Sequence, residues 1–221
     1  MYTNANGLGN KISELKVVLA SGKYKIICLT ETHLRNDITD TDLYMHLCLQ
    51  NFEVYREDRA SSSRGGGSLI YIHHSIASNV RRLDLFSGLE SVALEIKIED
   101  YSFILICMYR SCNLSDSRNQ RFIEEVQLIP NVASDKDVLI VGDINLPDVD
   151  WKSGCVKGPA DTNNKKLLIQ YDVLDSLVNN GVTWFLNEGF AREGWLIMFF
   201  KNLYLIKFLV ILVISFCTLI D

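Results

Sequence analysis

Short apolar runs that end in polar side chains constrain the fold of this chain more than any other feature of its sequence. Three such runs are residues 25–29 (KIICL), 103–109 (FILICMY) and 137–141 (DVLIV). Continuous apolar runs of this length are typical of strands in the interior of a sheet. Function is expected where such strands end, because a rigid sheet edge can hold polar side chains in fixed positions.

Strand-like and helix-like patterns alternate along the rest of the chain. Further strands are expected at residues 52–56, 68–72, 80–83 and 91–98, and the last of these forms a hairpin with residues 103–109. Helices are expected at residues 11–19, 116–129 and 163–178. Strands in meander order mixed with helices predict an α/β sandwich of two packed sheets.

Length and charge narrow the class of protein. A chain of 221 residues is expected to form one α/β domain. The net charge of -5 excludes a protein that coats nucleic acid through bulk positive charge. It does not exclude a nuclease, whose site is acidic because it must hold a metal. The six cysteines form no CxxC pair, so we expect buried free thiols and no zinc site.

Polar residues stand at four places where functional side chains are expected. They are Asn4 before the first helix, Glu31 after residues 25–29, Tyr109 and Arg110 at the end of residues 103–109, and Asp143 and Asn145 after residues 137–141. Each also has an ordinary structural interpretation: a residue near a helix cap, a solvated carboxylate, a core aromatic or a turn.

Taken together, these residue types suit metal-assisted phosphodiester hydrolysis. Mg²⁺ prefers oxygen ligands and usually takes one or two carboxylates, which suits Glu31. Asp143 and Asn145 can orient a water and hold a phosphate oxygen, and Tyr109 can donate a hydrogen bond to the phosphate. Such hydrolysis needs a Lewis acid, an activated water, and donors where negative charge develops.

The order of the motifs resembles that of the exonuclease–endonuclease–phosphatase superfamily. The amino-acid sequences of the motifs are most similar to the endonuclease of non-LTR retrotransposons. The segments that carry the resemblance are NANGLGNKISEL, IICLTETHL, FEVYREDR, RGGGSLIYI, LICMYRSC and VLIVGDINLPDVDW. Any one of these motifs is weak, whereas four in register with their strands are specific. The resemblance covers residues 1–189.

The resemblance implies an α/β fold, a two-sheet sandwich of the DNase I-like type, and a DNA-nicking endonuclease that uses Mg²⁺ or Mn²⁺ and no small-molecule cofactor. Asn4 and Glu31 would be metal-site residues, and Tyr109 would contact the scissile phosphate. Asp143 would position or activate the attacking water, and Asn145 would bind the phosphate. Arg110 would contact the DNA backbone. A nuclear or cytoplasmic location follows from the same resemblance.

The chain departs from the family beyond residue 189. The family closes with Ser-Asp-His, whereas the last histidine here is His74, and Ile197 or Met198 stands where the family has an aspartate strand. We therefore expect a sandwich that is incomplete at the C-terminus, over residues 1–194, and little or no nuclease activity. Losing one such charge-stabilising group costs about 10²–10³-fold in rate.

Residues 195–221 are almost wholly apolar and approach the ~20 residues that a membrane span needs. We interpret them as a transmembrane segment, which would give a membrane location, or as non-native read-through, which we favour. Two alternative functions stay open: an inactive membrane-associated or binding remnant, and a lipid phosphodiesterase of the same superfamily. The residues Pro147 and Trp151 disfavour the lipid phosphodiesterase, because they resemble the retrotransposon branch of the superfamily.

Overall fold

Two β-sheets face each other in the computed structural model, which describes residues 1–35, 37–47, 49–60, 65–77, 79–158, 164–185 and 195–200. The four-stranded sheet has the order β1 (Tyr2–Asn4), β2 (Ile26–Thr30), β4 (Ser68–His73) and β3 (Phe52–Glu57). The six-stranded sheet has the order β11 (Val182–Phe185), β12 (Trp195–Phe200), β8 (Asp137–Asp143), β7 (Tyr101–Tyr109), β6 (Ser91–Ile98) and β5 (Val80–Arg82).

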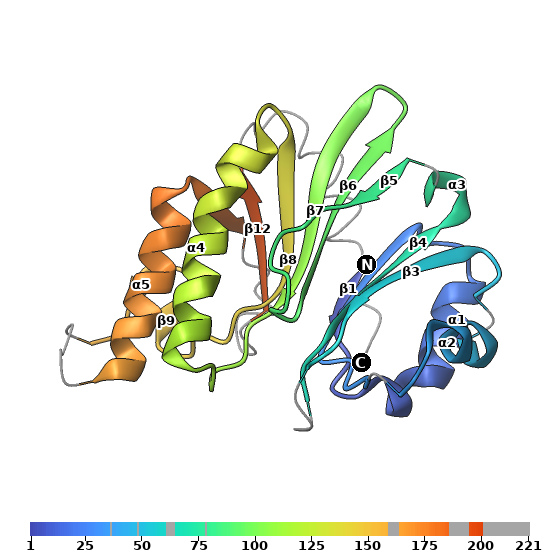
Figure 1. The fold of residues 1–221 in the computed structure, drawn as a ribbon, viewed down its shortest axis with the longest axis horizontal. Coiled ribbons are helices and arrows are strands. Elements are labelled where there is room, and N and C mark those ends of the chain that lie inside the picture. The colour runs from blue at the N-terminus through green and yellow to red at the C-terminus, as the bar shows by residue number, and fades with distance from the viewer. Residues whose placement is uncertain are drawn as a thin grey trace.

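Helices cover the outer face of each sheet (Figure 1). The 3-10 helix η1 (Leu8–Lys11), α1 (Ile12–Ala20) and α2 (Asp40–Leu47) belong to the four-stranded side, and α4 (Asp116–Ala133) and α5 (Lys165–Asn179) to the six-stranded side. The short helix α3 (His74–Ala77) follows β4, and β9 (Val149–Asp150) pairs with β10 (Cys155–Val156). This arrangement confirms the predicted two-sheet sandwich.

The core between the sheets is built from the alternating faces of the predicted strands. Ile70 and Ile72 of β4 pack with Leu94 of β6 and Leu105 of β7, and each is buried. Burying one such side chain contributes about 1.5–3 kcal/mol before the entropy of ordering it is subtracted. A second cluster, under α4 and α5, and a third, under α1 and α2, complete the core.

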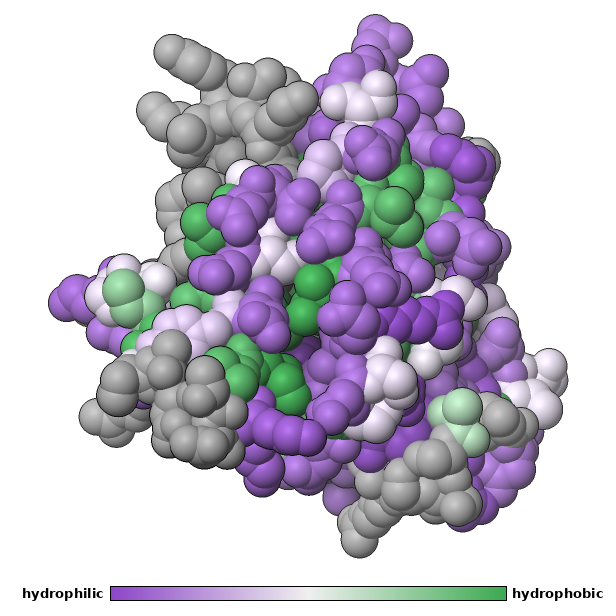
Figure 2. Space-filling view, turned by 60° about the vertical axis from the view of Figure 1, so that its left-hand side comes forward, coloured by the Kyte–Doolittle hydropathy of each residue, from purple (hydrophilic) through white to green (hydrophobic). Residues whose placement is uncertain are grey.

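Helix α4 shows how local sequence sets its position. The hydroxyl of Ser115 accepts a hydrogen bond from the Arg118 N–H at 3.4 Å, which caps the N-terminus of the helix. Phe122, Val126 and Ile129 then recur at helical spacing, and all three are buried against the six-stranded sheet. The face of the molecule on this side is mostly hydrophilic (Figure 2).

The structure contains elements that the sequence did not predict, among them β1, helix α2 and the pair β9–β10. Residues 195–200, which the sequence assigned to the apolar tail, form β12, which lies between β11 and β8 and pairs with β8 in the register Trp195↔Asp143. Buried thiols are confirmed for Cys28 and Cys107, whereas Cys112 and Cys155 are exposed.

Membrane association was expected only through the apolar tail. Within the part of the chain that the structure describes, no helix combines the length and apolar character that crossing a membrane requires. Residues 201–221, on which most of that expectation rests, lie outside the described residues.

Candidate active site

The predicted site residues lie at strand ends that the two sheets bring together. β1 runs parallel to β2 in the register Asn4↔Thr30, so Asn4 ends β1 beside the end of β2, and Glu31 follows directly. β7 runs parallel to β8 in the register Tyr109↔Asp143. Because β1 lies against β8 and β2 against β7, all four strands deliver their carboxyl ends to one place.

Asn4 links the acidic residues of the two sheets. Its side-chain nitrogen Nδ2 lies 3.2 Å from Oε1 of Glu31 and 3.3 Å from Oδ2 of Asp143, and it donates to both. Its oxygen Oδ1 accepts the N–H of Asn6 at 3.0 Å, which fixes the orientation of the amide. One amide group therefore holds two carboxylates that belong to different sheets.

Asp143 is the most perturbed carboxyl group of this cluster. Its side chain is buried, and burial raises its pKa to about 6, with a further contribution from the charge of Glu31. Hydrogen bonds from the Asn145 N–H, at 3.1 Å to Oδ1, and from Asn4 act in the opposite direction. A carboxyl group with a pKa near neutrality can exchange a proton with water at physiological pH.

Gly142 allows β8 to pack closely against β7 just before Asp143. A Cβ atom at this position would lie 1.9 Å from the backbone oxygen of Met108 on the neighbouring strand β7. Only a residue without a side chain fits so close to another backbone. The glycine of the Gly-Asp pair is therefore a requirement of the β7–β8 pairing.

Arg110 is a buried structural residue, which corrects the DNA-backbone contact expected from the sequence. The residue is 2% exposed, so a phosphate cannot reach its guanidinium. Its Nη1 donates to the carbonyl oxygens of Ile144 and Asn145, both at 3.1 Å, and its Nη2 donates to Oδ1 of Asn119 at 2.8 Å. Burial lowers the pKa of Arg110 to about 10.

Asn145 and Arg110 hold each other in place through two hydrogen bonds. Nδ2 of Asn145 donates to the carbonyl oxygen of Arg110 at 2.9 Å, and the Asn145 backbone adopts a φ of 49°. A left-handed conformation is uncommon for a residue other than glycine and persists only where neighbouring contacts enforce it. Arg110 and Asn145 therefore fix the turn that follows β8.

Tyr109 is partly buried at the end of β7. Burial, together with the nearby charges of Glu31 and Asp143, raises the pKa of its hydroxyl well above the ordinary value. The hydroxyl therefore keeps its proton at physiological pH and can act as a hydrogen-bond donor.

Sequence reasoning missed three residues that border the site. Nε2 of His33 lies 3.5 Å from Oε2 of Glu31. Arg59 lies over the ring of Tyr109, with its Cζ 5.9 Å from the ring centroid. Glu90 pairs with Arg59 at 3.0 Å. His33 could have been found from its place beside Glu31, and Arg59 from its place at the end of the segment FEVYREDR, whereas the position of Glu90 carried no signal.

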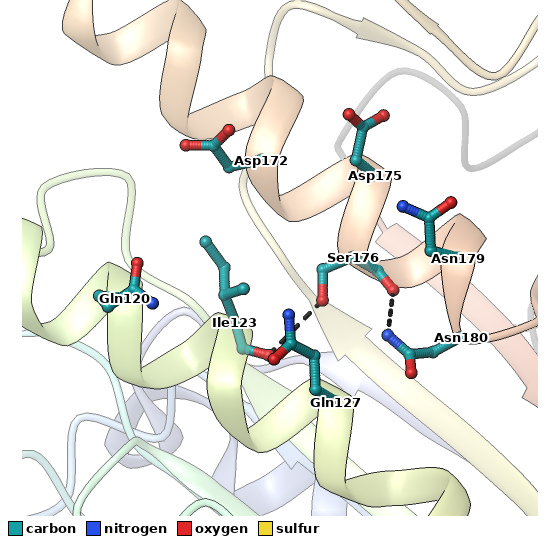
Figure 3. A pocket seen from close by; sticks show the side chains of 8 residues that line it. All are labelled: Gln120, Ile123, Gln127, Asp172, Asp175, Ser176, Asn179 and Asn180. Carbon is teal, nitrogen blue, oxygen red and sulfur yellow. Dashed lines mark hydrogen bonds between the residues drawn. The ribbon is translucent and has the colours of Figure 1, made fainter.

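A separate groove lies between α4 and α5 and contains none of the predicted site residues (Figure 3). Its side chains are mostly amides and carboxylates, among them Gln120, Gln127, Asp172 and Asp175. The hydroxyl of Ser176 donates to the carbonyl oxygen of Ile123 across the two helices at 3.5 Å. We assign this groove no catalytic role.

Comparison with known proteins supports the fold and leaves the sequence family open. No family model matches the chain, and no curated protein matches its sequence. Among solved structures, the endonuclease domain of TRAS1, a telomere-specific non-LTR retrotransposon, is 15% identical with a TM-score of 0.62, and the match covers 91% of this chain and 83% of that one.

Two further structures show the same likeness. The AP endonuclease LMAP from Leishmania major is 13% identical with a TM-score of 0.64, and the match covers 90% of this chain and 78% of that one. The 3' phosphatase NExo from Neisseria, bound to product DNA hairpin, is 14% identical with a TM-score of 0.55, and the match covers 90% of this chain and 85% of that one. At such identities the likeness establishes the fold alone.

Proposed function

We propose that this chain, which has the DNase I-like fold, is a metal-dependent DNA endonuclease of the kind carried by non-LTR retrotransposons. The observation that carries the proposal is the joining of Glu31 and Asp143 by the Asn4 amide across the two sheets. The structural neighbours are nucleases and phosphatases, which supports phosphodiester hydrolysis in general. The match to the TRAS1 endonuclease domain supports the retrotransposon assignment.

The donor set fits Mg²⁺ or Mn²⁺ better than zinc. Among the residues that the structure describes, no three histidine, cysteine or acidic side chains gather around one point, as a zinc site requires. Mg²⁺ keeps several waters and needs only one or two carboxylates, which Glu31 offers together with the Asn4 amide. The bound ion would supply a Lewis acid that polarises the scissile phosphate.

The remaining chemical roles, which are proton transfer, positioning of the water and contact with the phosphate, fall to side chains of the protein. Asp143, with a pKa of about 6, accepts a proton from the attacking water and holds that water in line with the phosphate. The Asn145 side chain and the protonated hydroxyl of Tyr109 contact the phosphate oxygens on which negative charge develops. Arg110 fixes the turn that carries Asn145.

We further propose that these 221 residues, taken alone, hydrolyse DNA slowly. They contain no histidine after His74 and no Ser-Asp-His segment. The charge stabilisation that the family obtains from that histidine is worth roughly 3–4 kcal/mol, or about 10²–10³-fold in rate.

A plasmid-nicking assay with Mg²⁺ tests the proposal. The set comprises the chain itself, the chain with residues 195–221 replaced by a family-like ending that contains Ser-Asp-His, and that version with Glu31→Gln or Asp143→Asn. Asp172→Asn, in the groove between α4 and α5, is the matched control. We expect nicking by the version with the family-like ending, retained in the control and lost in both site variants and in EDTA.

Three results would contradict the proposal. Nicking that survives Glu31→Gln and Asp143→Asn would show that another site does the chemistry. A folded version with the family-like ending that ignores DNA but releases phosphate-containing headgroups from sphingomyelin or phosphoinositide vesicles would favour the lipid phosphodiesterase. A folded version that binds DNA or vesicles without hydrolysis would favour the binding remnant.

A further inference from the structure

The pair Arg59–Glu90 borders the site and has no part in the mechanism above. Arg59 follows β3, and Glu90 directly precedes β6, so the pair joins the two sheets. Nε of Arg59 donates to Oε1 of Glu90 at 3.0 Å, and Nη2 donates to Oε2 at 3.1 Å. The Glu90 side chain is 4% exposed. Such a two-point contact is stronger and more specific in geometry than a single hydrogen bond between arginine and a carboxylate.

Glu90 also fixes the glycine loop that precedes β4. Its Oε2 accepts the N–H of Gly67 at 3.0 Å, and its carbonyl oxygen accepts the hydroxyl of Ser68 at 2.7 Å. A Cβ on Gly66 would lie 1.9 Å from the same Oε2, so the chain passes closer to the carboxylate than a side chain would allow. Glu90 is therefore held by backbone and side-chain contacts of this loop as well as by Arg59.

Tyr109 is held by both members of the pair. Its backbone N–H donates to the carbonyl oxygen of Glu90 at 3.0 Å. The guanidinium of Arg59 lies over its ring, 5.9 Å from Cζ to the centroid, within the range of a cation–π contact. Glu31 and Asp143 place negative charge near the phenol, and the charge of Arg59 opposes theirs.

We propose that Arg59 is a positioning residue of the active site. Braced by Glu90, it holds the Tyr109 ring in the orientation that meets the phosphate and offsets the negative charge of the two site carboxylates. The inference rests on the proposed function, because the phosphate contact of Tyr109 belongs to that proposal.

The competing interpretation is an ion pair that only stabilises the fold. Arg56 and Asp58 supply a comparison in the same region of the chain. Their side chains are 14% and 5% exposed, with 2.8 Å between Nη2 and Oδ2, and Arg59 is also 14% exposed. The Arg56 side chain contacts Ile38, Asp40 and Asp58, none of which is a predicted site residue. Arg56→Lys is therefore the matched control for Arg59→Lys.

The first measurement needs no nucleic acid. The full chain is labelled with 3-fluorotyrosine, and the Tyr109 signal is identified by its loss in Tyr109→Phe. Arg59→Lys keeps a positive charge for Glu90 but removes the planar group over the ring. We expect Arg59→Lys to shift the Tyr109 fluorine signal and Arg56→Lys to leave it in place. An unmoved signal in Arg59→Lys would overturn the inference.

The second measurement is the Kd for a short DNA duplex, taken by fluorescence anisotropy with Ca²⁺ in place of Mg²⁺ and with the duplex recovered uncut afterwards. We expect Arg59→Lys to weaken binding about fivefold, which corresponds to the ~1 kcal/mol common for coupled residues in contact. In a Tyr109→Phe background the same change should have almost no further effect. Arg56→Lys should leave Kd unchanged.

The outcomes separate the two proposals. An equal loss of affinity from Arg59→Lys in both backgrounds would overturn the inference, because Arg59 would then act independently of Tyr109. No loss in either background would overturn it as well. A wild-type chain that does not bind DNA would overturn the proposed function and the phosphate part of the inference, while the fluorine spectrum still decides whether Arg59 orients Tyr109.

Discussion

At the scale of single residues, the site combines two carboxylates that repel each other and one amide that holds them together. Glu31 raises the pKa of Asp143, and Asn4 lowers it. Asp143 is also buried, so its charged form is costly in the absence of a cation. This cost has measurable consequences for stability.

The first prediction concerns the pH dependence of stability without metal. The pKa of Asp143 is about 6 in the folded chain against an ordinary value of 3.8, so the folded state favours the protonated form. The stabilisation from this protonation is complete below about pH 4 and is lost as pH rises through 6, a difference on the order of 2–3 kcal/mol. Urea unfolding in EDTA measures it.

Asp143→Asn is the control for that pH dependence, because it cannot titrate. The difference in unfolding free energy between wild type and this variant should change between pH 4 and pH 7. A difference that stays constant over this range would show that Asp143 titrates alike in the folded and unfolded states.

The second prediction concerns Arg110. Lysine cannot reproduce the contacts of Nη1 and Nη2 with Ile144, Asn145 and Asn119, so buried acceptors lose their donors in Arg110→Lys. We expect a loss of about 2–4 kcal/mol in the free energy of unfolding. Arg121→Lys, in a half-exposed pair with Glu125, should change it by less than about 0.5 kcal/mol. A stable Arg110→Lys with weakened DNA binding would restore the role expected from the sequence.

At the scale of elements, the sequence predicted those whose patterns depend on their own residues. The runs at 103–109 and 137–141 lie within β7 and β8 because continuous apolar residues leave few alternatives to an interior strand. Helix α2 was missed because only Leu43 and Leu47 of its residues are buried hydrophobics. Its position depends on packing against α1, which no local pattern records.

In the site, too, the sequence predicted residues with a local pattern and missed contacts that depend on how the sheets pack. Glu31, Tyr109 and Asp143 were predictable because each lies at or beside the end of a recognisable strand, whereas Asn4 was predicted from its place before the first helix. The partnership of Arg59 and Glu90 was not, since the two are distant in sequence and meet only when the sheets pack. Arg110 was expected to contact the DNA backbone, but its guanidinium is buried against Ile144, Asn145 and Asn119, which no local pattern records.

The third prediction concerns the pairing of β7 with β8. Gly142→Ala would place a Cβ 1.9 Å from the Met108 carbonyl oxygen, so one of the strands must move. We expect a loss of roughly 1–3 kcal/mol, the range common for overpacking. Gly9→Ala, which has no atom within 4 Å of the added Cβ, should be nearly neutral. Equal stability of the two variants in thermal unfolding would contradict the register described here.

At the scale of the whole molecule, the site exists only when the two sheets are packed. Asn4 and Glu31 belong to the four-stranded sheet, and Tyr109 and Asp143 to the six-stranded sheet. The core between the sheets therefore determines the distance between the two carboxylates. A substitution deep in this core can alter the site without touching any of its residues.

The fourth prediction concerns metal and global stability. A cation that binds the folded chain alone raises its stability by RT ln(1 + [L]/Kd), about 2.7 kcal/mol at a hundred times Kd. We expect Mg²⁺ to raise the Tm of wild type and to have a much smaller effect on Glu31→Gln. EDTA should reverse the shift. An equal shift in both proteins would place the cation elsewhere.

The Asn4 amide, which bridges two sheets, also has a consequence for the lifetime of the protein. Without a cation, the repulsion between Glu31 and Asp143 acts across the interface between the halves of the sandwich and favours their separation. Proteases cleave chains that open in this way, at a rate that follows the population of the open form. Under the proposed function, a bound divalent cation would therefore slow this opening and lengthen the time for which a molecule resists proteolysis.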